Sequence, residues 1–138
     1  MNKLILLLIA GFCLTLSSCK KGPGEGGTSS IKGKVWVTDY NGEFTSVKGE
    51  YWGEDEKVYI IYGDDISYSD RISTGPGGEF EFKFLRPGKY TIYVYSKDKE
   101  GVVGPPANPN APDEAIEVEV EIKKKKEEVD AGTISIFN

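Results

Sequence analysis

The chain has 138 residues and a formal charge of −5 at pH 7, with 17 lysine and arginine side chains against 22 aspartates and glutamates. This length suits one domain, and the acidic balance disfavours nucleic acid as a partner, because binding nucleic acid needs a cationic surface. The sequence contains no histidine, and its cysteines are Cys13 and Cys19. A disulfide, a zinc site, a Cys/His nucleophile pair and a Ser-His-Asp triad are therefore excluded from the folded part.

Residues 1–18 have the order of a secretory signal peptide. Lys3 supplies a positive charge, and an apolar run and two serines then lead to Cys19. The apolar run is shorter than the ~20 residues that a membrane-spanning helix needs. The motif Leu16-Ser17-Ser18-Cys19 resembles the bacterial lipobox, in which the cysteine is acylated and becomes the first residue of the mature protein. An ordinary signal peptide that happens to contain a cysteine is the alternative.

Three segments follow from this interpretation: a signal peptide at 1–18 that is removed, a lipidated cysteine with a flexible tether at 19–30, and a folded domain at 31–138. The tether is rich in glycine and almost devoid of apolar side chains, so burial cannot offset its ordering entropy. Lys20 and Lys21 would lie beside the lipid, where they either contact anionic head groups or keep the segment soluble. We expect a lipid-anchored protein of the cell envelope, in the outer membrane of a Gram-negative bacterium.

From Ile31 onward the hydrophobic period is two, which predicts an all-β domain. Segment 79–84 places three phenylalanines on one face and three charges on the other, and a Pro-Gly turn leads from it into 90–95, so these two strands are expected to form a hairpin. Segment 116–122 alternates four β-branched residues with three glutamates. The pattern favours a seven-stranded antiparallel two-sheet β-sandwich, with strands at 31–37, 58–62, 71–74, 79–84, 90–95, 116–122 and 133–137.

Residues 73–91 read STGPGGEFEFKFLRPGKYT. This threonine, glycine-containing turn, G-x-F-x-F strand and P-G-x-Y-T ending resemble the central signature of carboxypeptidase regulatory-like domains. Segments 31–35 and 129–134 resemble that family's first strand and closing motif, whereas the longer segment 40–56 and the insertion 97–115 depart from its pattern. The resemblance implies a transthyretin-like sandwich that serves as an accessory, spacer or binding module, and it brings no catalytic residues with it.

If the family's strand order applies, the second, fifth and sixth of these strands share a sheet. Its outer face would then present Tyr59, Tyr93 and Tyr95 beside an acidic border, which suits a sugar ring or a protein partner. Alternatively, the tyrosines are present only for their strand propensity and cross-strand pairing. Trp36 and Trp52 are further candidate ligand contacts, with loop anchoring as the alternative role.

Oxygen ligands of the type that calcium prefers occur at Asp64 and Asp65, and separately at Asp39 and Asn41. Turn formation by these residues explains both stretches, so neither a metal nor another cofactor is expected. Lysines 123–126 are most simply a solvated hairpin end that discourages edge pairing.

The leading prediction is therefore a non-enzymatic accessory or binding module, anchored in the cell envelope, with a protein or glycan as its ligand. A structural spacer without a ligand of its own is the first alternative. A hydrolase that uses Glu117 and Glu119 as acid and base is the second, although their strand face would be flat and exposed.

Overall fold

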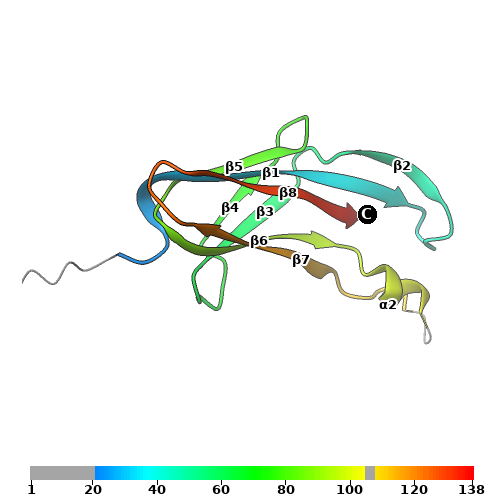
Figure 1. Cartoon of the computed structure of the whole chain (residues 1–138). Helices are drawn as coiled ribbons and strands as arrows, with labels where there is room; N and C mark the ends of the chain where they lie inside the picture. Colours follow the sequence, from blue (N-terminus) through cyan, green and yellow to red (C-terminus); the bar gives the residue numbers. More distant parts are fainter. Residues whose placement is uncertain (1–20, 105–107) are drawn as a thin grey trace, which may run out of the picture.

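The structure is a computed structural model that describes residues 21–104 and 108–138. The expected signal peptide and Cys19 lie outside the described residues. The fold is nearly all β, and two sheets pack face to face (Figure 1). Each sheet has four strands. The predicted all-β sandwich is confirmed, with eight strands in place of the seven expected.

The first sheet contains β1 (Glu25–Tyr40), β2 (Val47–Trp52), β5 (Glu79–Leu85) and β8 (Glu128–Phe137). The second sheet has the order β4 (Asp70–Ser73), β3 (Lys57–Tyr62), β6 (Gly88–Ser96) and β7 (Glu114–Ile122). The strands expected at 58–62, 90–95 and 116–122 therefore share a sheet, as the resemblance implies. A short helix, α2 (Lys99–Val103), lies in the insertion between β6 and β7, where the Asp98 side chain caps its first turn.

Strand β1 is the centre of the first sheet and pairs with three others. Its first part pairs antiparallel with β5 and its last part antiparallel with β2, while β8 runs parallel to it along the opposite side. Val35 lies where β5 gives way to β2: its N–H donates to Gly78 O and its carbonyl accepts from Gly53 N, each at 2.9 Å. The expectation of a wholly antiparallel sandwich is therefore wrong for the β1–β8 pair.

Alternate side chains from both sheets fill the core, as a period of two requires. Fully buried members are Ile31, Val35, Val37, Val58, Ile60, Ile92, Val94 and Ile134. Gly33 also faces inward, opposite Phe80 on β5. A Cβ atom at Gly33 would lie 2.5 Å from Phe80 Cζ and 2.8 Å from Gly132 O, so the phenylalanine ring occupies the space of the missing side chain.

Strand β5 departs from the predicted three-phenylalanine face. Phe80 and Phe82 are buried, but Phe84 is 71% exposed and Leu85 is buried in its place. Phe84 has a positive φ of 58°, and the β1–β5 register shifts beside it, between Ser29 and Ile31. This irregularity reverses the side-chain direction at the end of the strand.

The predicted hairpin between segments 79–84 and 90–95 is also wrong. Strand β5 pairs with β1, whereas β6 pairs with β3 and β7, so the connecting turn crosses from one sheet to the other. Alternation and a Pro-Gly turn are common to a hairpin and to a sheet-changing corner. Only the long-range partners distinguish the two arrangements.

Strand β2 was not expected, because segment 40–56 lacks clean alternation. The strand is exposed along most of its length, and Figure 1 shows it beyond the ends of β6 and β7 of the second sheet. Because β2 buries few side chains, its sequence shows only a weak alternation of apolar and polar residues.

Strand β1 begins at Glu25, within the segment for which composition predicts a flexible tether. Arg86 and Tyr90 hold this glycine-rich start of the described chain through its backbone. The Arg86 Nε donates to Gly22 O at 2.8 Å, and Gly24 N donates to the buried Tyr90 hydroxyl at 2.8 Å. Hydrogen bonds from distant residues thus order a segment that has few apolar side chains to bury.

The Gly33–Phe80 contact makes a direct stability prediction. Gly33→Ala should lower the free energy of unfolding by about 1–3 kcal/mol, because the added methyl group overpacks the core against an aromatic ring and a backbone carbonyl. Gly49→Ala on β2 is the matched control: nothing lies within 4 Å of its Cβ position, so stability should stay equal or rise by up to ~1 kcal/mol. Urea unfolding measures both, and equal stability of the two variants would contradict the packing argument.

Candidate functional site

Three of the predicted site residues meet on the outer face of the second sheet. Tyr59 on β3 lies directly opposite Tyr93 on β6, and their rings stack with centroids 4.9 Å apart and planes 8° from parallel. Tyr95 meets both rings edge to face, at 5.5 Å from each centroid. The register of β3 and β6 therefore produces a compact aromatic group from residues far apart in the sequence.

A fourth tyrosine, Tyr68, completes this group and was not predicted. It lies in the connection between β3 and β4 and packs edge to face on Tyr59, with centroids 5.1 Å apart. The connection folds back because Ser69 N donates to Ile60 O at 2.8 Å and Tyr62 N donates to Ser69 Oγ at 3.1 Å. No periodicity in the sequence signals this, since Tyr68 belongs to no strand. We name Tyr59, Tyr68, Tyr93 and Tyr95 the tyrosine cluster.

Exposure divides the tyrosine cluster into a buried base and an accessible rim. Tyr93 is 8% exposed, with the Tyr59 ring stacked on it and Tyr95 packed edge to face against it, whereas Tyr95 is 47% exposed and Tyr68 is 50% exposed. The Tyr59 and Tyr93 rings present their faces to each other. A ligand that stacks on an aromatic face would therefore meet Tyr95 and Tyr68.

Across the four strands of the second sheet, the stacked pair of Tyr59 and Tyr93 is flanked by a cation on one side and a carboxylate on the other. On β4, Arg71 is the register partner of Tyr59, with its guanidinium carbon 6.0 Å from the ring centroid. On β7, the exposed Glu117 is the partner of Tyr93. The outer face thus combines aromatic rings with one cation and one carboxylate.

A hollow of about 270 Å³ opens beside Tyr59 and Tyr95, at the ends of β3, β6 and β8. Its polar lining includes an ion pair between Lys97 Nζ and Asp113 Oδ1 at 2.9 Å, together with Lys57 and Asn138. Glu56 also lines it; burial raises the pKa of the Glu56 carboxyl, the Asp55 charge adds to this, and Lys57 opposes it. The hollow supplies hydrogen-bonding groups next to an exposed aromatic ring, on a scale that suits a small ligand unit.

The two tryptophans lie on the opposite side of the molecule. Trp36 on β1 and Trp52 on β2 are register partners on the outer face of the first sheet, and their rings pack edge to face with centroids 4.9 Å apart. Lys34 Nζ lies 4.6 Å from the Trp52 centroid. Both tryptophans are strand residues that pair with each other, so they do not join the tyrosine cluster.

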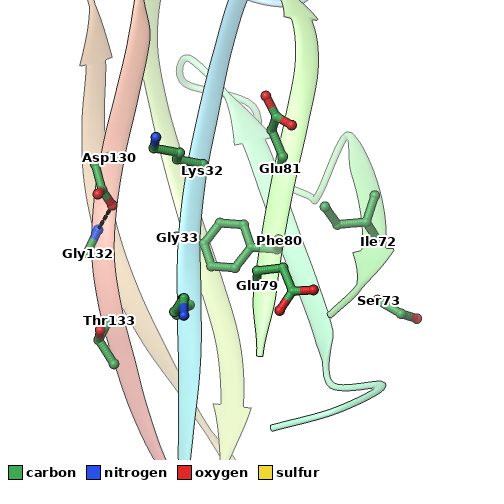
Figure 2. Close-up of a pocket in the computed structure, with 11 residues that line it drawn as sticks. Lys32, Gly33, Ile72, Ser73, Glu79, Phe80, Glu81, Asp130, Gly132 and Thr133 are labelled. Carbon is green, nitrogen blue, oxygen red and sulfur yellow. Dashed lines mark hydrogen bonds between the residues drawn. The ribbon is translucent and has the colours of Figure 1, made fainter. Parts of the chain in front are cut away.

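A second hollow, of about 620 Å³, lies along β5 and is lined by residues of both charges. Figure 2 shows the Phe80 ring beside Gly33 in its wall, with Lys32, Glu81 and Asp130 around the opening. Lys32 pairs with Glu128, and Glu81 lies 3.4 Å from Lys83, so much of this charge is balanced within the protein. The hollow holds none of the sequence-predicted candidates and gives no preference for a particular ligand charge.

Of the potential calcium ligands, Asp39 lies on β1, whereas Asn41, Asp64 and Asp65 lie in the connections that follow β1 and β3. The Asn41 side chain accepts hydrogen bonds from Thr45 N at 2.8 Å and Ser46 N at 3.1 Å, which closes its own turn. Asp65 accepts from Ser69 in the folded-back connection. Within residues 21–104 and 108–138, no group of three or more acidic side chains is arranged to hold a metal ion.

No helix in the described part of the chain is long and apolar enough to cross a membrane. Cys19, the predicted lipidation site, lies outside the described residues.

The burial of Tyr93 predicts a late titration. Burial raises the pKa of Tyr93 to about 12, with a contribution from the neighbouring Tyr95. Because this value exceeds the ~10 of an unfolded tyrosine, the neutral phenol stabilises the fold below about pH 10, and that contribution is lost as the pH rises towards about 12. Tyr93→Phe keeps the ring and removes the phenol, so its melting temperature should fall less steeply over this range than that of the wild type.

Tyr62 is the control for this titration, because burial and the nearby Glu25 raise its pKa to about 12 as well. Ultraviolet titration of phenolate should show a late step that Tyr93→Phe and Tyr62→Phe each reduce by one tyrosine. A Tyr93→Phe variant with an unchanged late step would contradict the burial of Tyr93.

No family model matches the chain, and no curated protein matches it. A solved structure of a candidate carbohydrate-binding protein from Pseudomonas aeruginosa is similar over 83% of this chain and 91% of its own, with 13% sequence identity and a TM-score of 0.42. At this TM-score the likeness carries no argument about the ligand. The carboxypeptidase regulatory-like family is not confirmed by these comparisons.

Proposed function

We propose that this chain is a non-enzymatic binding module of the bacterial cell envelope, held at the membrane by an acylated Cys19, and that its ligand contacts the tyrosine cluster. The cluster itself is the observation that carries this proposal. Four tyrosines gather on one sheet face, and two of them, Tyr68 and Tyr95, expose about half of their surface. Exposed aromatic groups with a polar border are typical of ligand contacts.

A glycan is the ligand class that this chemistry fits best. Sugar rings present C–H faces that stack on aromatic rings, and Tyr95 and Tyr68 are the members of the cluster with the most accessible surface. Sugar hydroxyls need both donors and acceptors, which Lys57, Asn138 and the Lys97–Asp113 pair provide around the adjacent hollow. A protein partner could use the same surface and is a separate outcome of the experiment below.

The positions of Glu117 and Glu119 support binding over hydrolysis. Both carboxylates are exposed on β7, which is an edge strand of the second sheet. Acid and base catalysis depends on groups held close to the substrate and shielded from bulk water. An exposed sheet face supplies neither condition.

We also propose membership of the carboxypeptidase regulatory-like family. The shared sheet of β3, β6 and β7 follows the strand order that the resemblance implies, and it is this order that places Tyr59 and Tyr93 side by side. Accessory and binding roles are usual in that family, which agrees with the proposed function.

Ligand binding is tested with the mature chain and a glycan panel, first by thermal shift. A glycan at ~100 times its dissociation constant should add ~2.7 kcal/mol and raise the melting temperature by about 10 °C or more. Titration calorimetry with the glycan that stabilises the protein should then show at least a tenfold loss of affinity for Tyr95→Ala, which removes an exposed stacking surface. Tyr68→Ala should act in the same direction.

Trp52→Ala is the matched control, because Trp52 is a large aromatic residue of similar exposure on the other sheet. Its affinity should equal that of the wild type. Binding that survives Tyr95→Ala and Tyr68→Ala, or that is lost in Trp52→Ala, would contradict the proposed surface. A panel without any stabilising glycan would favour a protein partner or a spacer, and turnover of a glycan that Glu117→Gln abolishes would favour a hydrolase.

Anchoring is tested independently by intact mass of the protein purified from bacterial membranes. Cleavage before Cys19 and addition of acyl chains should give the mass of residues 19–138 plus the lipid. Cys19→Ser should remove the lipid mass and release the protein from the membrane fraction. An unmodified mass for the wild type would exclude the lipid anchor.

A further inference from the structure

Basic side chains gather at the end of the domain where the described chain begins. The turn between β7 and β8 carries four consecutive lysines at 123–126, which we name the lysine turn, and all four are exposed. Figure 1 shows this turn beside the start of β1, at the end of the sandwich opposite α2 and the β1–β2 connection. At the same end, Arg86 is bound to backbone carbonyls of the first described residues, and Lys89 on β6 lies opposite Glu121 on β7 and near Asp64 and Asp65, so the excess of cations there comes from the lysine turn.

Hydrogen bonds fix the lysine turn to the first residues of β1. The Ser29 hydroxyl donates to Lys124 O at 3.0 Å, Lys126 N donates to Thr28 Oγ1 at 3.2 Å, and Ser30 N donates to Glu127 O at 2.9 Å. These contacts join segments that lie almost a hundred residues apart in the sequence. The lysine turn therefore keeps a set position relative to the start of the fold.

The two glutamates after the lysine turn are directed at groups of the protein. The Glu127 carboxylate accepts hydrogen bonds from Lys123 N at 2.7 Å and Lys124 N at 3.1 Å, and these bonds lower its pKa. The Glu128 carboxylate pairs with Lys32 on β1. Both carboxylates thus satisfy partners within the fold, while the lysine side chains extend into solvent.

The chain between Cys19 and the ordered segment is short. Arg86 binds Gly22 O at 2.8 Å and also the carbonyl of Glu25, so the fold holds the backbone from Gly22 onward. Only Lys20 and Lys21 separate Gly22 from Cys19. An extended chain covers about 3.5 Å per residue, which places the Cys19 Cα within roughly 10 Å of Gly22.

We propose that the lysine turn docks on anionic lipid head groups of the leaflet that holds the acyl chains. The proposal rests on the anchoring at Cys19 proposed above. The attraction of lysine to a charged leaflet extends over about one Debye length, roughly 8–10 Å, which matches the reach of the short connection. The lysine turn, together with Lys21, then supplies several cations within that distance.

The opposite end of the sandwich is negatively charged, so an anionic leaflet repels it. This end carries more acidic residues than lysines: Asp39, Glu43, Glu54, Asp55, Glu56, Asp98, Glu100 and Asp113 stand against Lys48, Lys57, Lys97 and Lys99, of which Lys57 pairs with Asp55 and Lys97 with Asp113. Attraction at one end and repulsion at the other orient the domain with its strands rising from the membrane. Tyr95 lies at the end of β6, and the adjacent hollow is lined by Lys97 and Asp113 of the insertion that follows, so this orientation directs the proposed ligand site away from the bilayer.

The docking surface is tested by vesicle flotation with residues 19–138 carrying Cys19→Ser, a chain that has no acyl group and retains every described residue. Vesicles of phosphatidylcholine alone are compared with vesicles that also contain phosphatidylglycerol. The protein should bind only the anionic vesicles, and less as salt increases. The triple variant Lys123→Gln, Lys124→Gln, Lys125→Gln should lower the partition coefficient at least tenfold, because each lysine contributes about fivefold at such a surface.

The matched control is Lys34→Gln, Lys48→Gln, Lys99→Gln, which removes the same charge away from the lysine turn. Its partition coefficient should equal that of the parent chain, and melting curves establish that both triple variants are folded. Equal losses in the two triple variants, or equal binding to both kinds of vesicle, would overturn the proposal. Because this chain carries no lipid, a negative result here is distinct from a failure of acylation, which the intact mass reports.

Discussion

The fold depends on β1 being shared as a backbone partner by three other strands. One edge of β1 pairs first with β5 and then with β2. The pairing partner changes at Val35, whose N–H donates to Gly78 O and whose carbonyl accepts from Gly53 N. Gly78 has a positive φ of 73°, and a Cβ atom there would lie 2.6 Å from Val35 O, so a glycine is needed at this junction. With the opposite side occupied by β8, the backbone of β1 is hydrogen-bonded along both edges and forms the rigid layer on which the second sheet packs.

The second sheet packs on this layer and holds a group of aromatic side chains in a fixed arrangement. Its inner face is held by Val58, Ile60 and Ile92, which are fully buried, so β3 and β6 cannot slip in register without exposing the core. On the outer face the same register stacks Tyr59 on Tyr93. The exposed Tyr95 and Tyr68 therefore rest on a base that is already assembled, and a ligand would lose little of its binding energy to ordering side chains.

The two ends of the sandwich have different chemistry. One end joins the start of the described chain to the lysine turn through Ser29 and Thr28, and the other combines acidic connections with the hollow beside Tyr95. A lipid anchor at the first end and a ligand at the second would place the two proposed contacts at opposite ends of the strands. Strands β1 and β8, which run in parallel between these ends, then set the separation between membrane and ligand.

The sequence by itself determined the strands with clean alternation, and the strand order implied by the family resemblance placed Tyr59, Tyr93 and Tyr95 on one outer face. This was possible because burial on one face imposes a local period of two. The partners of each strand were decided only by the tertiary structure: the parallel β1–β8 pair, the corner between β5 and β6, and the exposed Phe84 all depend on long-range contacts. The sequence analysis missed three features for the same reason: strand β2, the position of Tyr68, and the hydrogen bond from Arg86 to Gly22. Each is held by residues distant in the sequence and leaves no periodic signal in its own segment.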